Sequence, residues 1–193
     1  AGRAGEFAAY ALAAQLKSIG FKMGRMKTGT PPRIHRDSID FSVFTRQGGD
    51  DEREPFSIRS GGFLLPQVPS YIGRVQRTSI DIVTRNLEHS ALYSGRISGV
   101  SARYCPSFED KAVKFSHRDD HQLILEPEGL DTDEFYVSGL GNSLPMEIQL
   151  ELVRSVKGLE SAQIMRPAYA IEYDYVDPTQ LLPTLETKKI NAL

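Results

Sequence analysis

The most reactive side chain of the sequence is that of Cys105, the single cysteine of the chain. A proline follows it, so the backbone at this cysteine is expected in a turn or an extended loop rather than in a helix. Arg103 and Lys111 are close enough in sequence to favour the thiolate, whereas Glu109 and Asp110 would oppose it. A lone cysteine is more often an inert core residue than a nucleophile, and the local sequence leaves both interpretations open.

A basic stretch is the second feature with a chemical use. No acidic residue occurs from Phe7 to Arg36. Within it, residues 28–33 (TGTPPR) contain two prolines, which fix φ, remove two backbone donors and interrupt regular structure. Basic side chains beside such a turn are suited to hold phosphate, although a solvated surface would account for the same charges.

Composition and missing motifs exclude several classes of protein. The chain has 193 residues and a formal net charge of −2, which does not fit a polycation that coats nucleic acid. No run approaches the roughly 20 apolar residues of a membrane-spanning helix. A single cysteine forms no intrachain disulfide, which fits a reducing compartment. The sequence has no Walker A loop, no Gly-x-Gly-x-x-Gly fingerprint and no third ligand beside His117 and His121, so no metal site is predicted.

The periodicity of the apolar residues predicts the helices that must position these groups. Three are expected, over residues 5–19, 78–89 and 144–157. Thr78 with Asp81 predicts a capping box at the second helix, and Asn142 or Ser143 is expected near the cap of the third. Ser107 is expected to cap a further short helix just after the cysteine.

Strands and connections complete the expected fold. Extended structure is predicted over residues 21–28, 121–125, 134–140 and 168–176, and a long irregular connection over residues 45–70. Tyr169, Ile171, Tyr173 and Tyr175 share one face of the last strand, where core packing explains them better than base stacking. Helices interspersed with closely linked strands indicate a mixed α+β fold, with a mixed or antiparallel sheet and flanking helices.

Four longer stretches carry a resemblance to a known family. They are residues 26–33 (MKTGTPPR), 103–111 (RYCPSFEDK), 125–130 (LEPEGL) and 166–175 (RPAYAIEYDY). In this order and spacing they resemble the tRNA uridine 5-carboxymethylaminomethyl modification enzymes, also called the glucose-inhibited division protein A family. The resemblance covers essentially the whole chain. Its departures are small: Ser101-Ala102 stands where the family usually has Gly-Pro, Ala168 where it has Gly, and Asn142 where it has Thr.

The resemblance implies a place in a larger protein. The family's glycine-rich flavin motif has no counterpart here, so the chain is expected to be the central, inserted region of a flavoprotein with two dinucleotide-binding parts. Residues 1–34 would be a flank of the FAD-binding domain, residues 35–183 the inserted domain for NADH and substrate, and residues 184–193 the return to the FAD-binding domain.

The resemblance also implies an activity. Such enzymes use FAD, NADH and a methylene-tetrahydrofolate carbon to place an aminomethyl-type or carboxymethylaminomethyl group on C5 of the wobble uridine. The implied partners are tRNA, a tRNA-modification GTPase and a second copy of the full-length protein, with no membrane. The implied location is the bacterial cytoplasm, and an organellar homologue stays open.

Two other functions stay open beside this one. The chain alone would be a non-catalytic nucleotide- or RNA-binding module if it lacks the flavin site. The sister folate- and FAD-dependent tRNA uridine methyltransferase is the other alternative, although the stretch at residues 103–111 favours the first family.

The resemblance assigns site residues as well. Cys105 matches a cysteine implicated in catalysis, and its thiolate would add to C6 of uridine and make C5 nucleophilic. The predicted cofactor-binding stretch matches the family's NAD-binding segment and consists of Ser101, Ala102, Arg103, Tyr104, Cys105, Pro106, Ser107, Phe108, Glu109, Asp110, Lys111, Ala112, Val113, Lys114 and Phe115. The predicted contacts to the tRNA backbone are Lys22, Arg25, Lys27, Arg33 and Arg36.

Overall fold

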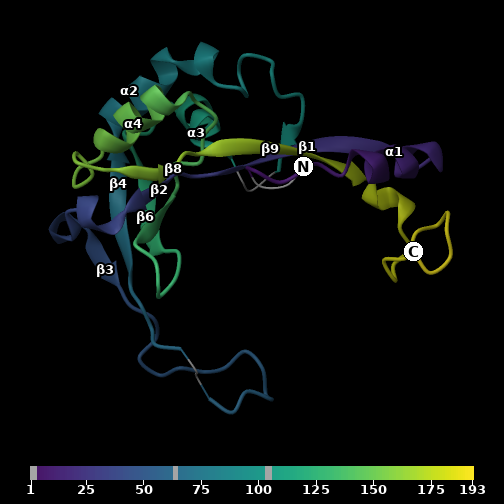
Figure 1. Ribbon diagram of the computed structural model, residues 1–193, viewed down its shortest axis with the longest axis horizontal. Helices are drawn as coiled ribbons and strands as arrows, with labels where there is room; N and C mark the ends of the chain where they lie inside the picture. Colours follow the sequence, from purple (N-terminus) through teal and green to yellow (C-terminus); the bar gives the residue numbers. More distant parts are fainter. Residues whose placement is uncertain (1–3, 63–64, 103–105) are drawn as a thin grey trace.

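The protein is built around two β-sheets (Figure 1). The structure is a computed structural model, and it describes residues 4–62, 65–102 and 106–193. In the described part of the chain, nine strands and four α-helices confirm the predicted mixed α+β class. The helices are α1 (Tyr10–Ser18), α2 (Arg77–Arg85), α3 (Phe108–Lys114) and α4 (Met146–Arg154). Short 3-10 helices cover Arg36–Ser38, Phe41–Val43, Leu87–His89 and Pro178–Gln180.

The larger sheet has six strands, and all its neighbouring pairs are antiparallel. Its order is β3 (Thr45–Gln47), β4 (Ser70–Gln76), β6 (Asp120–Pro127), β7 (Glu134–Ser138), β2 (Arg33–His35) and β8 (Ile164–Arg166). The apolar residues of β6 and β7 alternate with less buried ones, so that Leu123, Leu125, Phe135 and Val137 enter the core.

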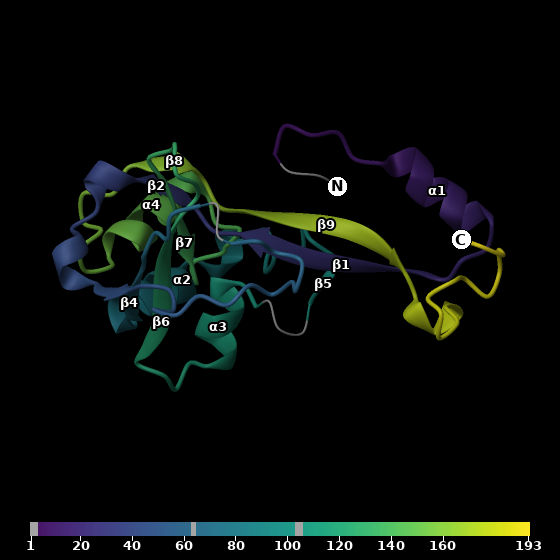
Figure 2. The same cartoon turned by 90° about the horizontal axis from the view of Figure 1, so that it is seen from below.

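The smaller sheet has three strands, β5 (Val100–Ser101), β1 (Met23–Thr30) and β9 (Tyr169–Val176). The long central pair β1–β9 is antiparallel, and β5 adds to β1 in the parallel sense. Figure 2 shows this pair as a ribbon that leaves the larger sheet and reaches toward α1 and the C-terminus.

The apolar core belongs to the larger sheet and to the helices that cover it. Ile80, Val83, Phe108 and Leu152 come from α2, α3 and α4 and are buried to 1% or less of their exposed area. They join the strand residues in a single cluster of buried apolar side chains. Helix α1, by contrast, contributes no buried residue. The hydrophobic core of the protein therefore lies between the larger sheet and helices α2, α3 and α4.

The predicted helices are right in number and place but differ at their ends. The first begins at Tyr10 rather than at residue 5, because Ala9 at its N-cap has no side-chain oxygen to satisfy the first amides. The predicted capping box is wrong: Gln76 is the N-cap of α2 and makes no side-chain cap bond, and Asp81 instead accepts from Arg77 Nε over 3.0 Å.

The start of α4 also differs from the prediction. Pro145 occupies the N-cap, where its fixed φ suits a chain about to turn into a helix. Asn142 makes its bonds outside the helix, since it accepts from the Leu144 amide over 3.0 Å and donates to the Leu140 carbonyl over 2.8 Å. The caps proposed at residues 142 and 143 are therefore wrong, although the helix itself exists.

The four predicted strands are present as β1, β6, β7 and β9, whereas β2, β3, β4, β5 and β8 were not predicted. Residues 45–47 form β3, so the irregular connection is shorter than predicted; its remaining described part projects from the sheets in Figure 1 and exposes Phe56 and Ile58 fully. The aromatic stripe of β9 is half-buried rather than part of the core cluster, so the core-packing interpretation of that stripe is wrong.

The chain passes between the two sheets at prolines. It leaves β1 through Pro31–Pro32 to enter β2, and it leaves β8 through Pro167 to enter β9. The predicted domain division at 34/35 and 183/184 stays a prediction. None of the helices in the described ranges is both long and apolar enough to cross a membrane.

Candidate functional site

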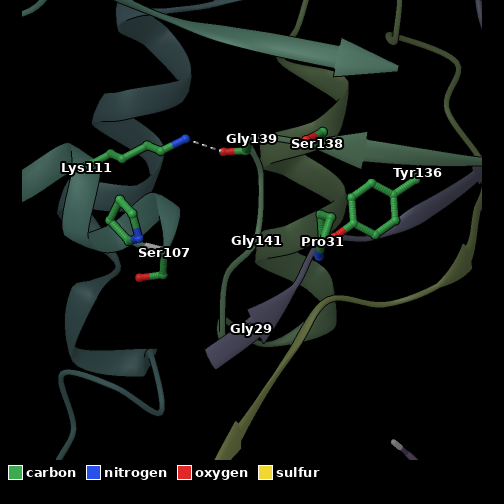
Figure 3. Close-up of a pocket in the computed structure, with 9 residues that line it drawn as sticks. Gly29, Pro31, Ser107, Lys111, Tyr136, Ser138, Gly139 and Gly141 are labelled. Carbon is green, nitrogen blue, oxygen red and sulfur yellow. Dashed lines mark hydrogen bonds between the residues drawn. The ribbon is translucent and has the colours of Figure 1, made fainter. Parts of the chain in front are cut away.

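A pocket of about 450 Å³ lies where the two sheets meet (Figure 3). The end of β1 contributes Gly29 and the turn after it Pro31, while Pro106 and Ser107 lead into α3 and Lys111 belongs to that helix. The end of β7 and the loop after it contribute Tyr136, Ser138, Gly139 and Gly141. Since ligand pockets span roughly 300–1,000 Å³, this one has room for a nucleotide-sized group.

Ser107 occupies the pocket wall because it caps α3, as predicted. Its Oγ accepts from the Asp110 amide over 3.3 Å. The next residue, Phe108, is fully buried in the core, and its amide donates to the Gly141 carbonyl over 2.6 Å. The core therefore fixes both Ser107 and the loop that faces it across the pocket.

Lys111 reaches across the pocket from α3. Its Nζ donates to the Gly139 carbonyl over 3.4 Å, the contact drawn in Figure 3. Gly139 itself has φ of +106°, and a Cβ there would lie 2.8 Å from the Gln122 carbonyl oxygen, so no other residue fits without strain. The lysine thus brings a mobile positive charge to a rigid glycine turn.

The opposite wall is built from β7. Tyr136 and Ser138 alternate with core residues Phe135 and Val137 and so point away from the apolar core. The Arg33 guanidinium lies 4.7 Å from the centre of the Tyr136 ring and is also paired with Glu128 over 2.6 Å. This wall therefore presents an aromatic ring and a hydroxyl beside the two glycines.

Behind the pocket, the fully buried Glu109 of α3 is hydrogen-bonded to the segments that contain Ser90 and Ser143. Its Oε1 accepts from Ser90 Oγ over 2.9 Å, from the Ser143 amide over 2.7 Å and from Ser143 Oγ over 2.8 Å. Since residue 143 follows the pocket loop, this carboxylate holds that loop against α3.

Asp110 is the second buried carboxylate of α3. Its Oδ2 accepts from Ser101 Oγ over 3.0 Å and from Ser107 Oγ over 3.3 Å, and its Oδ1 pairs with Lys114 over 3.0 Å. Burial raises the pKa of this carboxyl, but the bonds from Lys114 and Ser101 and the charges of Lys114 and Lys27 outweigh it, so the pKa lies below its ordinary value.

The predicted cofactor-binding stretch divides in the structure. Pro106, Ser107 and Lys111 line the pocket. Phe108, Glu109, Asp110 and Ala112 are buried behind it, and Ser101 supports Asp110 from β5. Val113, Lys114 and Phe115 lie at the exposed end of α3. Arg103, Tyr104 and Cys105, the predicted catalytic residue among them, lie outside the described residues, and Ala102 directly precedes them.

The predicted RNA-binding residues do not form one surface. Lys22 pairs with Asp177 over 2.8 Å, and Arg25 pairs with Asp174 over 3.0 Å on the ribbon. Arg33 and Arg36 follow the prolines and lie in and beside the larger sheet. Lys27 is 1% exposed. Contact with RNA stays a prediction; of these residues Lys22, Arg25 and Arg36 are exposed and Arg33 is half-buried.

Comparison with known proteins was decisive for the family. The family model described as Glucose inhibited division protein A matches residues 1–193. The chain belongs to this family. It is 58% identical over 193 residues to the tRNA uridine 5-carboxymethylaminomethyl modification enzyme MnmG of Syntrophobacter fumaroxidans, and 53% identical over 193 residues to the protein of that name from Thermodesulfovibrio yellowstonii.

The matches place the chain inside a longer protein of this family. It is fully covered in both alignments but spans only 30% and 31% of the two relatives. The form II crystal structure of Aquifex aeolicus GidA superposes with a TM-score of 0.80 at 44% identity, and the match covers 93% of this chain and 29% of that one. The fold described above is therefore that of the corresponding part of GidA.

Sequence reasoning missed much of the pocket wall. Tyr136, Ser138, Gly139 and Gly141 were not among the predicted site residues, although the pocket is lined by all four. The signal was present as two glycines spaced by one residue directly after a strand, a pattern that permits close approach of backbone to a ligand. Within the described residues, no cluster of three potential metal ligands occurs.

Proposed function

We propose that the chain is the NADH-binding central part of a tRNA-modifying flavoenzyme. The full-length protein would place a (carboxymethyl)aminomethyl group on C5 of the wobble uridine with FAD, NADH and a methylene-tetrahydrofolate carbon. The observation that carries the proposal is the convergence of two of the family's stretches, at Gly29–Pro31 and Pro106–Lys111, on one pocket. The names of the relatives supply the reaction class.

The pocket residues fit a dinucleotide. Lys111 offers an ammonium for phosphate oxygens, and the backbone at Gly139 and Gly141 allows close approach. Tyr136 offers a ring face for a planar base or nicotinamide. NADH would supply reducing equivalents, and the protein's part is to bind and orient it. FAD and the folate donor are proposed on the family membership alone.

Cys105 is proposed as the nucleophile. Uridine C5 is a poor nucleophile until a thiolate bonds to C6, which moves the electron pair of the C5–C6 double bond toward C5. The residues that directly follow, Pro106 and Ser107, line the pocket, so the thiol is at most two residues from its wall along the chain. The tRNA, a GTPase partner and a second protomer belong to the same proposal.

The test compares two lysines in the full-length protein. Lys111→Met should raise the dissociation constant for NADH roughly tenfold or more, because it removes one charge-assisted contact. Lys157→Met removes an exposed charge elsewhere and should leave the constant within about twofold. Equal constants in both variants, at unchanged melting temperature, would exclude this pocket as the NADH site.

A second variant separates the enzyme from the non-catalytic module. Cys105→Ser should bind NADH normally and lose wobble-uridine modification, measured on tRNA from a strain that carries only this variant. Normal modification by the Ser variant would remove Cys105 from the reaction. Normal NADH binding by a wild-type protein that modifies no uridine would support the module instead.

A further inference from the structure

Lys27 is a buried cation without a partner. Its side chain is 1% exposed, and within the described part of the chain its Nζ makes no hydrogen bond. Removal of an ammonium from water is unfavourable unless an anion or several acceptors replace the water. A sequence that retains such a group at the centre of a strand indicates a use beyond packing.

Two carboxylates on elements beside Lys27, those of Glu172 and Asp110, already have other donors. Glu172 lies opposite Lys27 on β9, yet its Oε1 accepts from the Gly99 amide over 2.7 Å and from the Ser98 amide over 2.9 Å. Asp110 is linked to Lys27 through Ser101, the β5 residue beside Lys27, and is held by its own partners on α3. Among the described residues, neither acid accepts a hydrogen bond from the Lys27 ammonium.

The position of Lys27 is next to the pocket. Residues two apart in a strand share a face of the sheet, so Gly29, which lines the pocket, stands on the same face as Lys27. From the other side, Ser107 both lines the pocket and bonds to Asp110, whose carboxyl is near enough to respond to the charge of Lys27. The buried lysine therefore lies on the face of β1 that reaches the pocket, close enough to α3 for its charge to act on Asp110.

We propose that Lys27 binds a phosphate group of a small ligand that enters the pocket between β1 and α3. The identification of that ligand as NADH rests on the proposed function. An RNA backbone lying on the surface does not reach a side chain that is 1% exposed, whereas a small phosphorylated ligand can enter. Lys27 would act from within, opposite the more accessible Ser107 and Lys111.

The experiment uses the full-length protein with Lys27→Met, a neutral side chain of similar length, and Lys27→Arg, which keeps the charge. Inorganic pyrophosphate and NADH are the two probes, and calorimetry gives their dissociation constants. The Met variant should bind both probes roughly ten- to a hundredfold more weakly. The Arg variant should retain a larger share of the affinity. Lys157→Met, which neutralises an exposed lysine outside the pocket, should change neither constant by more than about twofold.

Thermal stability without ligand separates binding from structure. Because Lys27→Met removes an uncompensated buried charge, the melting temperature should stay equal or rise. A lower melting temperature with unchanged binding of both probes would show a structural lysine and overturn the proposal. If the Met variant does not fold, that too supports a structural role, unless Lys27→Gln folds and shows the loss of affinity.

The outcomes also separate this inference from the proposed function. Unchanged NADH binding in Lys27→Met, with a wild-type protein that binds NADH, overturns the role of Lys27 alone. Binding of pyrophosphate that depends on Lys27, without any binding of NADH, upholds Lys27 and overturns NADH as the ligand. A wild-type protein that binds neither probe overturns both.

Discussion

The two sheets bury different kinds of side chain. The core cluster takes all its residues from the six-stranded sheet, its helices and its loops, and none from β1, β5 or β9. The most buried side chain of the three-stranded sheet is instead Lys27, and the neighbouring strand face carries Glu172 with hydrogen bonds to Ser98 and Gly99. The larger sheet, here called the apolar sheet, has an apolar core cluster, whereas the one buried side chain in the described strands of the smaller sheet, here called the polar sheet, is a lysine.

This contrast separates stability from function. Apolar burial stabilises roughly in proportion to area and needs no exact partner, so the larger sheet can fold on pattern alone. A polar interior stabilises only where each group is satisfied, and its unsatisfied members are candidates for ligand contacts. The pocket lies at the junction, with walls from both sheets.

The largest effect is expected in the apolar interior. Phe108→Ala, at a fully buried site, should lower the free energy of unfolding by about 3–5 kcal/mol. Phe56→Ala makes the same change at a fully exposed site of the connection between β3 and β4 and should stay within about 0.5 kcal/mol. Urea unfolding of both variants measures the difference. If both variants lost a similar free energy of unfolding, the connection between β3 and β4 would be packed in solution, and burial would not distinguish the two sites.

The next effect concerns the polar support of the pocket. Glu109→Ala leaves the Ser143 amide and two hydroxyls without their acceptor, at about 1–3 kcal/mol for each buried donor that finds no other. Glu109→Gln keeps a carbonyl oxygen in place and should lose clearly less. Urea unfolding compares the two variants, and an equal loss would mean that the charge of Glu109, rather than its acceptor geometry, holds the loop.

A smaller effect depends on pH and lies within the apolar sheet. Burial lowers the pKa of His121, the charges of Lys111 and Arg118 lower it further, and Asp120 opposes them. The unfolded chain therefore takes up a proton first, so stability is complete above about pH 6.5 and is lost as the pH falls through the folded value. Urea unfolding at pH 7.5 and pH 5.5 should show this loss.

The controls for this prediction are two matched substitutions. His121→Phe should flatten the loss between the two pH values, since Phe108 and Phe115 already surround that ring. His117→Phe changes an exposed histidine and should leave the loss as it is in the wild type. The same slope in all three proteins would contradict a titrating role for His121.

The smallest effect is local and belongs to the polar sheet. Burial raises the pKa of Glu172, but the Gly99 and Ser98 amides and Arg25 outweigh it, so the pKa is lowered. Its stabilisation is present above the unfolded value of about 4.3 and is lost as the pH falls through the folded value. At pH 7, Glu172→Gln should speed hydrogen exchange of the Ser98 and Gly99 amides a few-fold and leave core amides unchanged. Faster exchange throughout the six-stranded sheet would show that the two interiors are not independent.

Two of the six strands of the apolar sheet, β6 and β7, were predicted from the sequence, as were the helices that cover it. The alternation of Leu123 and Leu125 marks β6, and the Ser107 cap marks the start of α3, since both signals are local. The helix starts near residues 9 and 145 were less predictable, because no side-chain cap fixes them.

The polar sheet and the pocket could not be derived in the same way. Lys27 stands in a basic stretch that suggests surface, and only the pairing of β1 with β5 and β9 shows that it is enclosed. Strand β5 has two residues, too few for any periodicity. The pocket needs β7 beside β2, a pairing between residues about a hundred positions apart, which local pattern does not encode.

The prolines at the sheet boundary have a consequence for strand pairing. The last pair of the β1–β9 ladder is Thr30 with Tyr169, and the β2–β8 pairing resumes at Arg33 with Arg166. Between them, Pro31 and Pro32 have no amide hydrogen, and the Ala168 amide donates to Gln149 Oε1 over 2.7 Å instead of across the ladder. At this line the hydrogen bonds run to other elements instead: the Pro32 carbonyl accepts from the Val137 amide of β7 over 3.2 Å, and the Ala168 carbonyl accepts from Gln149 Nε2 of α4 over 3.0 Å. Pro31 lines the pocket at that line, so the cavity stands where the direct strand pairing of the ribbon gives way to that of the larger sheet.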